Sequence, residues 1–181
     1  DQYPDTTTVG EVGADNALEV IAQYTADGDK LHMAYSFDLL HEHHSAEYLH
    51  QVFGKFGRIV KDGWPSWAIS NHDCPRIRTR WGGQQGGEAV ARLAAAMQMT
   101  LRGSPCIYQG DELGLPEVPD IPEDRLADPI AHRMRDKEKG RDGCRVPLPW
   151  VGEGSSYGFG PDCGAEPHLP QPAGWGAFAV E

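Results

Sequence analysis

The stretch Ala68-Ile69-Ser70-Asn71-His72-Asp73 decides how the rest of the chain is interpreted. Its apolar part continues a run that opens near Pro65, as expected for a short buried strand, and Pro75 prevents the strand from extending because proline has no backbone donor. Asn71, His72 and Asp73 therefore fall at the carboxyl end of a strand, where parallel α/β proteins place their chemistry. On these residues alone, capping of the next helix explains His72 and Asp73 equally well.

A second carboxylate lies in the same kind of place. The β-branched run Thr6-Thr7-Thr8-Val9 leads to Glu11, whose glycine neighbours let the backbone approach closely and leave the carboxylate exposed. The separation of Glu11 and Asp73 fits two βα units of about 30 residues each. We therefore expect both carboxylates to end parallel strands of one sheet and to point to the same face.

Helices and strands are expected to alternate along the chain. Four strand candidates separated by three helices indicate a parallel α/β fold with right-handed crossovers. After the first strand, further strands are expected at 31–40, 64–69 and 104–108. Helices are expected at 17–24 after Asn16, in the segment that Ser45 caps, and at 88–102 before Gly103.

Composition excludes several classes of partner. The chain has 181 residues and a net charge of -11, which argues against a nucleic-acid or anionic-membrane surface because such a surface needs a clustered positive field. No apolar run approaches the roughly 20 residues that span a bilayer. The start of the sequence has no signal-peptide pattern. A cytoplasmic location is expected because the cysteine spacing fits a reducing compartment.

The histidine-rich segment His41-Glu42-His43-His44 suggests a metal site, but its spacing is wrong. A zinc-protease motif needs a second histidine four positions after the first, and Ser45 stands there instead. We interpret the segment as a polar loop before a helix and expect neither a metal nor a cofactor. The four widely spaced cysteines are expected to be reduced, because none forms a Cys-x-x-Cys pair; they are Cys74, Cys106, Cys144 and Cys163.

Four ordered motifs give the chain a family resemblance: 9–12 around Glu11, 70–73 around Asp73, 103–112 and 141–150. Together they resemble the second half of an α-glucosidase of the α-amylase superfamily, glycoside hydrolase family 13. This resemblance implies a partial (β/α)8 TIM barrel, about strands five to eight with their helices and a long loop after the last strand. A complete barrel needs about 250 residues.

The resemblance also implies domain boundaries. Residues 1–150 would be the carboxyl-terminal half of the catalytic barrel, and 151–181 a Gly/Pro-rich loop leading to the missing last barrel helix. The missing amino-terminal half would then be the natural partner, and self-association is expected because half a barrel leaves sheet edges unpaired.

The resemblance assigns roles to particular residues. Glu11 resembles the general acid/base, and Asp73 the carboxylate that stabilises the oxocarbenium-like transition state. His72 resembles a donor to sugar hydroxyls, and Arg145, or alternatively Arg141, the arginine that closes the pocket at the nonreducing end. A closed pocket implies a retaining, exo-acting α-glucosidase of small oligosaccharides.

The chain departs from the family pattern at the nucleophile. No segment matches the Gly-Phe-Arg-x-Asp type motif, so the 181 residues are expected to be inactive alone. Glucosyltransferase, trehalose synthase and sucrose isomerase activities stay open, as does a noncatalytic carbohydrate-binding fragment. Arg76, Asp111 and Glu112 are expected to support the site, whereas for Asp38 a solvated strand end and a functional role fit equally.

Overall fold

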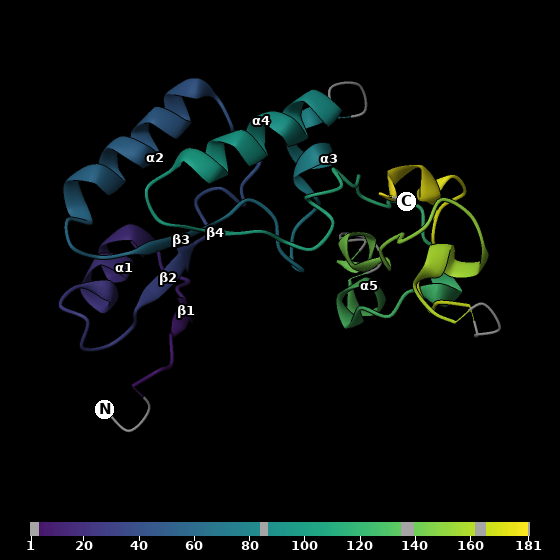
Figure 1. Cartoon of the computed structure of the whole chain (residues 1–181), viewed down its shortest axis with the longest axis horizontal. Coiled ribbons are helices and arrows are strands. Elements are labelled where there is room, and N and C mark those ends of the chain that lie inside the picture. Colours follow the sequence, from purple (N-terminus) through teal and green to yellow (C-terminus); the bar gives the residue numbers. More distant parts are fainter. Residues whose placement is uncertain (1–3, 84–86, 135–139, 162–165, 181) are drawn as a thin grey trace. The chain divides into compact units, whose positions relative to one another are not determined.

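The structure is a computed structural model that describes residues 4–83, 87–134, 140–161 and 166–180 (Figure 1). Its parallel sheet has the strand order β1-β2-β3-β4, so strands that follow one another in the chain are neighbours in space. The strands are β1 (Val9–Glu11), β2 (Met33–Ser36), β3 (Pro65–Ala68) and β4 (Ser104–Cys106). This confirms the expected parallel α/β arrangement, although β2, β3 and β4 are shorter than predicted.

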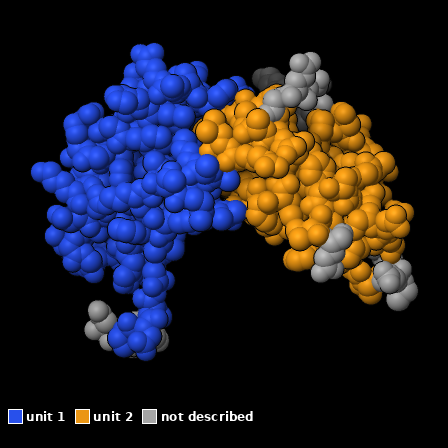
Figure 2. Space-filling model, turned by 45° about the horizontal axis from the view of Figure 1, so that its top comes forward, with its two compact units in different colours: residues 1–69, 94–107 blue, residues 70–93, 108–181 orange. Residues whose placement is uncertain are grey.

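The chain divides into two compact units (Figure 2). The first contains Asp1–Ile69 and Ala94–Ile107, and therefore the whole sheet. The second contains Ser70–Leu93 and Tyr108–Glu181. The boundary after Ile69 falls within the stretch that ends the third strand.

Two helices of the first unit begin near the predicted positions, α1 (Ala17–Thr25) and α2 (Ala46–Ile59). Ser45 caps α2 as expected, because its side chain accepts a hydrogen bond from the Tyr48 N–H at 3.1 Å. Asn16 lies at the N-cap position of α1 as predicted, but its side chain makes no capping hydrogen bond. Helix α1 packs on β2 and α2.

Trp67 on β3 is the centre of the first unit's core. Only 1% of it is exposed, and its ring meets Phe56 edge-on with centroids 5.0 Å apart. The indole N–H donates to the Arg102 carbonyl at 2.8 Å, and buried Gln98 donates to the Trp67 carbonyl at 2.6 Å. Every residue of β3 is buried, so this strand is fixed by its packing up to the point where the polar residues begin.

Short elements dominate the second unit. Helices α3 (Ile77–Gly82) and α5 (Pro129–Arg133) were not predicted. Helix α4 (Gly87–Thr100), whose second half from Ala94 belongs to the first unit, matches the predicted helix 88–102. It ends at Thr100, two residues earlier than predicted, so Gly103 is not its cap. A core of Leu115, Val146 and Trp175 holds the unit together. Its described residues also form four 3-10 helices: Glu123–Arg125, Asp142–Arg145, Ser155–Gly158 and Trp175–Phe178.

Candidate active site

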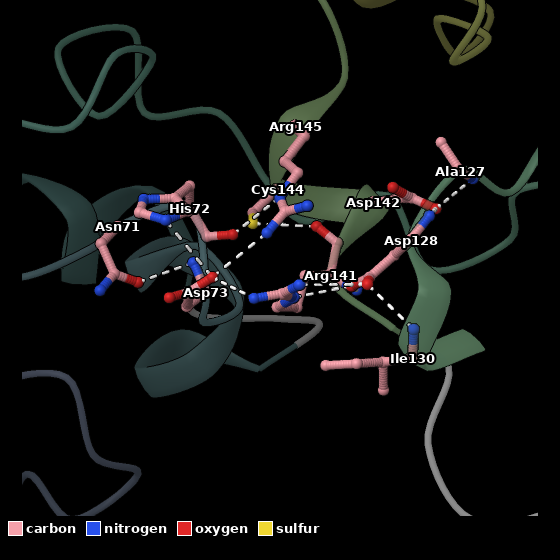
Figure 3. A network of polar contacts seen from close by, with 10 residues as sticks. All are labelled: Asn71, His72, Asp73, Ala127, Asp128, Ile130, Arg141, Asp142, Cys144 and Arg145. Carbon is pink, nitrogen blue, oxygen red and sulfur yellow. Dashed lines mark hydrogen bonds and ion pairs between the residues drawn. The ribbon is translucent and has the colours of Figure 1, made fainter. Parts of the chain in front are cut away.

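Asn71, His72 and Asp73 form a turn after β3 (Figure 3). The Asp73 N–H donates to the Asn71 side-chain carbonyl at 2.9 Å. Neither His72 nor Asp73 caps the next helix, because α3 begins at Ile77, whose N–H donates to the Ser70 hydroxyl at 3.1 Å. The capping interpretation is therefore wrong, and the two side chains are available for other contacts.

One carboxylate oxygen of Asp73 is in contact with two arginines and a histidine (Figure 3). Its Oδ1 accepts from Arg141 Nη1 at 2.6 Å and from Arg145 Nη2 at 3.2 Å, and His72 Nε2 lies 3.5 Å away. The Asp73 side chain is 41% exposed, so each ion pair by itself adds little stability. Together these contacts orient the Asp73 carboxylate through Oδ1. Among the described residues Oδ2 has no partner, so it can accept a hydrogen bond from a ligand.

Arg145 holds the same turn at a second point. Its Nε donates to the His72 carbonyl at 2.8 Å while Nη2 reaches Asp73. Arg145 ends the 3-10 helix Asp142–Arg145, and Arg141 directly precedes that helix. The two arginines therefore approach Asp73 from one short segment, and both candidates for the closing arginine lie beside the predicted carboxylate.

A buried carboxylate stands behind Arg141. Asp128 Oδ2 accepts from the Arg141 main-chain N–H at 2.8 Å and from Nε at 2.7 Å, and Oδ1 accepts from Nη2 at 3.1 Å. These bonds hold the pKa of Asp128 far below its usual range and raise the pKa of Arg141. Asp142 completes the network, because its Oδ2 accepts from the Ala127 and Asp128 N–H groups at 2.8 and 2.9 Å.

The sequence did not reveal this network. Asp128-Pro129 and Arg141-Asp142-Gly143 were interpreted only as turns. A burial signal was absent, because both aspartates lie among prolines and charged residues and not in a periodic segment. An aspartate directly before a proline that begins a helix is the one local hint, since Asp128 also accepts from the Ile130 N–H as the cap of α5.

Arg76 binds the main chain of the segment 141–145, which carries Arg141 and Arg145. It is 1% exposed, and it donates through Nη1 to the Gln109 carbonyl at 2.8 Å and through Nη2 to the Cys144 carbonyl at 2.9 Å. The Tyr108 hydroxyl donates to the same Cys144 carbonyl at 3.0 Å. Gly110 is required here, because its φ is +96° and a Cβ would lie 2.6 Å from Arg76 Nη1. Arg76 thus has the expected supporting position.

The two acids of the 103–112 motif have different surroundings. Glu112 accepts from the Gly110 N–H at 2.7 Å, which is a structural contact of the expected kind. Both carboxyl oxygens of Asp111 are buried, and no hydrogen bond of normal geometry to a described residue satisfies them. Burial raises the pKa of Asp111 to about 6, against the opposing effects of the Ser70 hydroxyl and of Arg76 and Arg80.

Glu11 ends β1 in the first compact unit, opposite Tyr35 of β2, and its side chain is exposed. The structure therefore brings His72, Asp73, Arg141 and Arg145 together, while the pairing of Glu11 with them stays a prediction. Asp38, whose role was left open, accepts a hydrogen bond from the Ser36 hydroxyl just past β2.

The segment 41–44 is exposed, and in it His44 Nδ1 contacts the Glu42 carbonyl at 2.7 Å. In the described part of the chain, no group of three or more His, Cys, Asp or Glu side chains is arranged to hold a metal ion. Cys74, Cys106 and Cys144 are free thiols, and Cys163 lies outside the described residues. No described helix has the length and apolar character needed to cross a membrane.

The sequential parallel sheet, and the carboxylate held by two arginines after a strand end, define the class: an α/β module of the kind found in barrel enzymes. Residues 1–172 match the family model of the α-amylase catalytic domain. The chain belongs to this family.

Known proteins of the same kind resemble much of the chain. It is 41% identical over 153 residues to a probable α-glucosidase of Rhizobium meliloti, covering 83% of this chain and 28% of that protein. It is 32% identical over 193 residues to a glucan 1,6-α-glucosidase of Streptococcus pneumoniae, covering 86% of this chain and 35% of that protein. The chain thus spans about a third of the length of these relatives.

Two solved structures have folds similar to that of this chain. The crystal structure of the α-glucosyl transfer enzyme XgtA superposes with a TM-score of 0.89 at 44% identity, covering 99% of this chain and 32% of that one. The trehalose-6-phosphate hydrolase of Bacillus licheniformis superposes with a TM-score of 0.74 at 25% identity, covering 97% and 36%.

Proposed function

We propose that these 181 residues are about strands five to eight of the barrel of a retaining, exo-acting α-glucosidase that hydrolyses small oligosaccharides. The observation that supports this most is the Asp73 carboxylate, held at Oδ1 by Arg141 and Arg145 with Oδ2 open toward a ligand. Family membership and the α-glucosidase names of the relatives support the same activity.

The proposed chemistry needs two carboxyl groups about 5 to 5.5 Å apart and an oxocarbenium-like transition state. Glu11 donates a proton to the leaving oxygen and later takes one from water. Asp73 accepts hydrogen bonds from hydroxyls of the glucosyl ring through Oδ2, and these bonds strengthen as the ring becomes cationic. His72 donates to the same sugar, and Arg145 bounds the pocket at its nonreducing end.

The nucleophile has to come from outside these residues, because no segment of the chain has the Gly-Phe-Arg-x-Asp type motif. The amino-terminal half of the barrel would supply it and would also pair with the free edges of the sheet. We therefore expect the chain to be inactive alone and active once the barrel is completed.

Reassembly of two separately expressed halves tests this proposal. The 181-residue chain, the amino-terminal half of the complete enzyme and a mixture of both are assayed for hydrolysis of p-nitrophenyl α-glucoside. Activity in the mixture alone is expected. Activity of the 181-residue chain by itself would contradict the assignment of the nucleophile to the other half.

Glucosyl transfer is a second candidate, and the 44% identity to an α-glucosyl transfer enzyme favours it. Both reactions share a glycosyl-enzyme intermediate and differ in whether water or a sugar hydroxyl attacks it. Chromatography of the products from maltose separates them: glucose alone indicates hydrolysis, and tri- and tetrasaccharides indicate transfer.

A further inference from the structure

We propose that Asp128 is a positioning residue that orients Arg141 and, through it, fixes the Asp73 carboxylate. The inference rests on the proposed function, since it concerns the carboxylate assigned there to transition-state stabilisation. Asp128 itself does not reach the sugar; its effect is transmitted through the arginine.

The bonding of Asp128 is directed mainly at Arg141. The carboxylate has no exposed surface, and of its four hydrogen bonds to described residues three come from Arg141, one from the main chain and two from the guanidinium. The fourth comes from the Ile130 N–H at 3.0 Å, and it caps a helix of five residues. Capping alone would need only this last contact.

The planar shape of the Arg141 guanidinium means that these bonds fix its orientation. Its donors lie in one rigid plane, so bonds from Nε and Nη2 to the two Asp128 oxygens fix both the plane and its rotation. Nη1 is then directed at Asp73 Oδ1, 2.6 Å away (Figure 3). The Arg141 side chain is 33% exposed, and without Asp128 it would regain the rotamers of a long flexible side chain.

Asp142 stabilises Asp128 in turn. Its buried carboxylate binds the N–H groups of Ala127 and Asp128, which fixes the backbone that carries the positioning carboxylate. A series of hydrogen bonds therefore connects a buried turn to a half-exposed carboxylate, in the order Asp142, Asp128, Arg141 and Asp73 (Figure 3).

Arg145 differs from Arg141 in what holds it. Its contacts in the described part of the chain are the His72 carbonyl and, at the longer distance of 3.2 Å, the same Asp73 oxygen. No carboxylate stands behind it there. Arg141 is thus the arginine of the pair that a buried carboxylate orients, whereas among the described residues Arg145 is held by the turn that carries Asp73.

The test is a double-mutant cycle in the complete enzyme. Asp128→Asn should lower kcat for p-nitrophenyl α-glucoside about 100-fold, the usual effect of a misplaced catalytic group, with KM changed less than threefold. Arg141→Met should cost a similar factor. The double variant should be no worse than Arg141→Met alone, because Asp128 acts through the arginine.

Asp124→Asn is the matched control, because Asp124 is an exposed aspartate on the 3-10 helix Glu123–Arg125. It should leave kcat and KM unchanged. An Asp128→Asn enzyme that is folded and retains its kcat overturns the proposal, and so do losses from Asp128→Asn and Arg141→Met that multiply.

Asp142 and the carboxyl group of Asp73 offer two further tests. If Asp128→Asn unfolds, Asp142→Asn loosens the same turn and should lower kcat about tenfold in the parent but not in Arg141→Met; a loss in both backgrounds overturns the proposal. If the parent enzyme hydrolyses no α-glucoside, the proposed function has failed. The inference is then judged by the ¹³C signal of the Asp73 carboxyl, which Asp128→Asn should shift in the parent and leave unshifted in Arg141→Met.

Discussion

The interior of the sheet and the carboxylate cluster after β3 are built by different forces. Around Trp67 the contacts are apolar or neutral, with aromatic rings and the Gln98 amide filling the space. Around Asp73 the contacts are ionic, and the most buried ion pair joins Arg141 to Asp128. Apolar burial tolerates small shifts of its members, whereas a charge network works only when each donor meets its acceptor. The sheet is therefore a scaffold, and the cluster is the part in which small changes alter chemistry.

The largest expected effect concerns Glu11, which belongs to the scaffold unit but is assigned a chemical role. Glu11→Gln in the complete enzyme should lower kcat for a natural α-glucoside by a factor of about 10⁴ or more, because the amide cannot transfer a proton. Its melting temperature should stay close to that of the parent, since Glu11 is exposed. Turnover within a factor of a few of the parent would remove Glu11 from the role of acid/base.

The scaffold is tested by Trp67→Ala. This change empties the space between β3 and α2 and removes the bond to the Arg102 carbonyl, so the free energy of unfolding should fall by about 3–5 kcal/mol. Urea unfolding of the complete enzyme measures it. Trp150→Ala is the control, since Trp150 is 60% exposed and its loss should cost less than about 0.5 kcal/mol. Equal costs at the two positions would contradict the core assigned here.

Asp111, a buried acid outside the cluster around Asp73, should make the free energy of unfolding depend on pH. Burial raises its pKa to about 6, above the unfolded value near 3.8, so the folded protein binds the proton more tightly. Its contribution is fully present below about pH 4 and is lost as the pH rises through 6, which lowers the free energy of unfolding by up to about 3 kcal/mol.

Urea unfolding of the parent and of Asp111→Asn between pH 4 and 7.5 measures this contribution. The parent should lose more stability with rising pH than the variant does. Parallel curves for the two proteins would show that Asp111 does not titrate in this range.

The smallest expected effect concerns Arg145. Arg145→Ala should raise KM for maltose about tenfold, the equivalent of about 1.4 kcal/mol, because one contact to the sugar is lost. The same change should improve the relative rate on longer maltooligosaccharides. An unchanged chain-length preference would indicate that Arg141 bounds the pocket, and the corresponding Arg141→Ala variant then becomes the comparison.

The same contrast explains what could be predicted from the sequence. The buried strand before Asp73 and the Ser45 cap depend on residues close together in the chain, so local patterns were sufficient. The bonds from Arg141 to Asp128 and Asp73 join residues 13 and 68 positions apart. No periodicity marks such pairs, and turn-forming residues around Asp128 concealed its burial. The contact of Ser70 with α3 was not predicted either, because this helix is short and has no visible apolar face that would mark its first residue, whose N–H donates to the Ser70 hydroxyl.

We expect Asp73, oriented by the two arginines, to stabilise the transition state of glucoside cleavage. Asp73→Asn in the complete enzyme tests this role most directly, because asparagine keeps the shape of the side chain but removes its charge and replaces one accepting oxygen by a donating NH2 group. Measured with p-nitrophenyl α-glucoside, kcat should fall by about 10⁴ while the circular dichroism spectrum and melting temperature stay near those of the parent and of Asp124→Asn. A folded Asp73→Asn enzyme with kcat within tenfold of the parent would contradict the account.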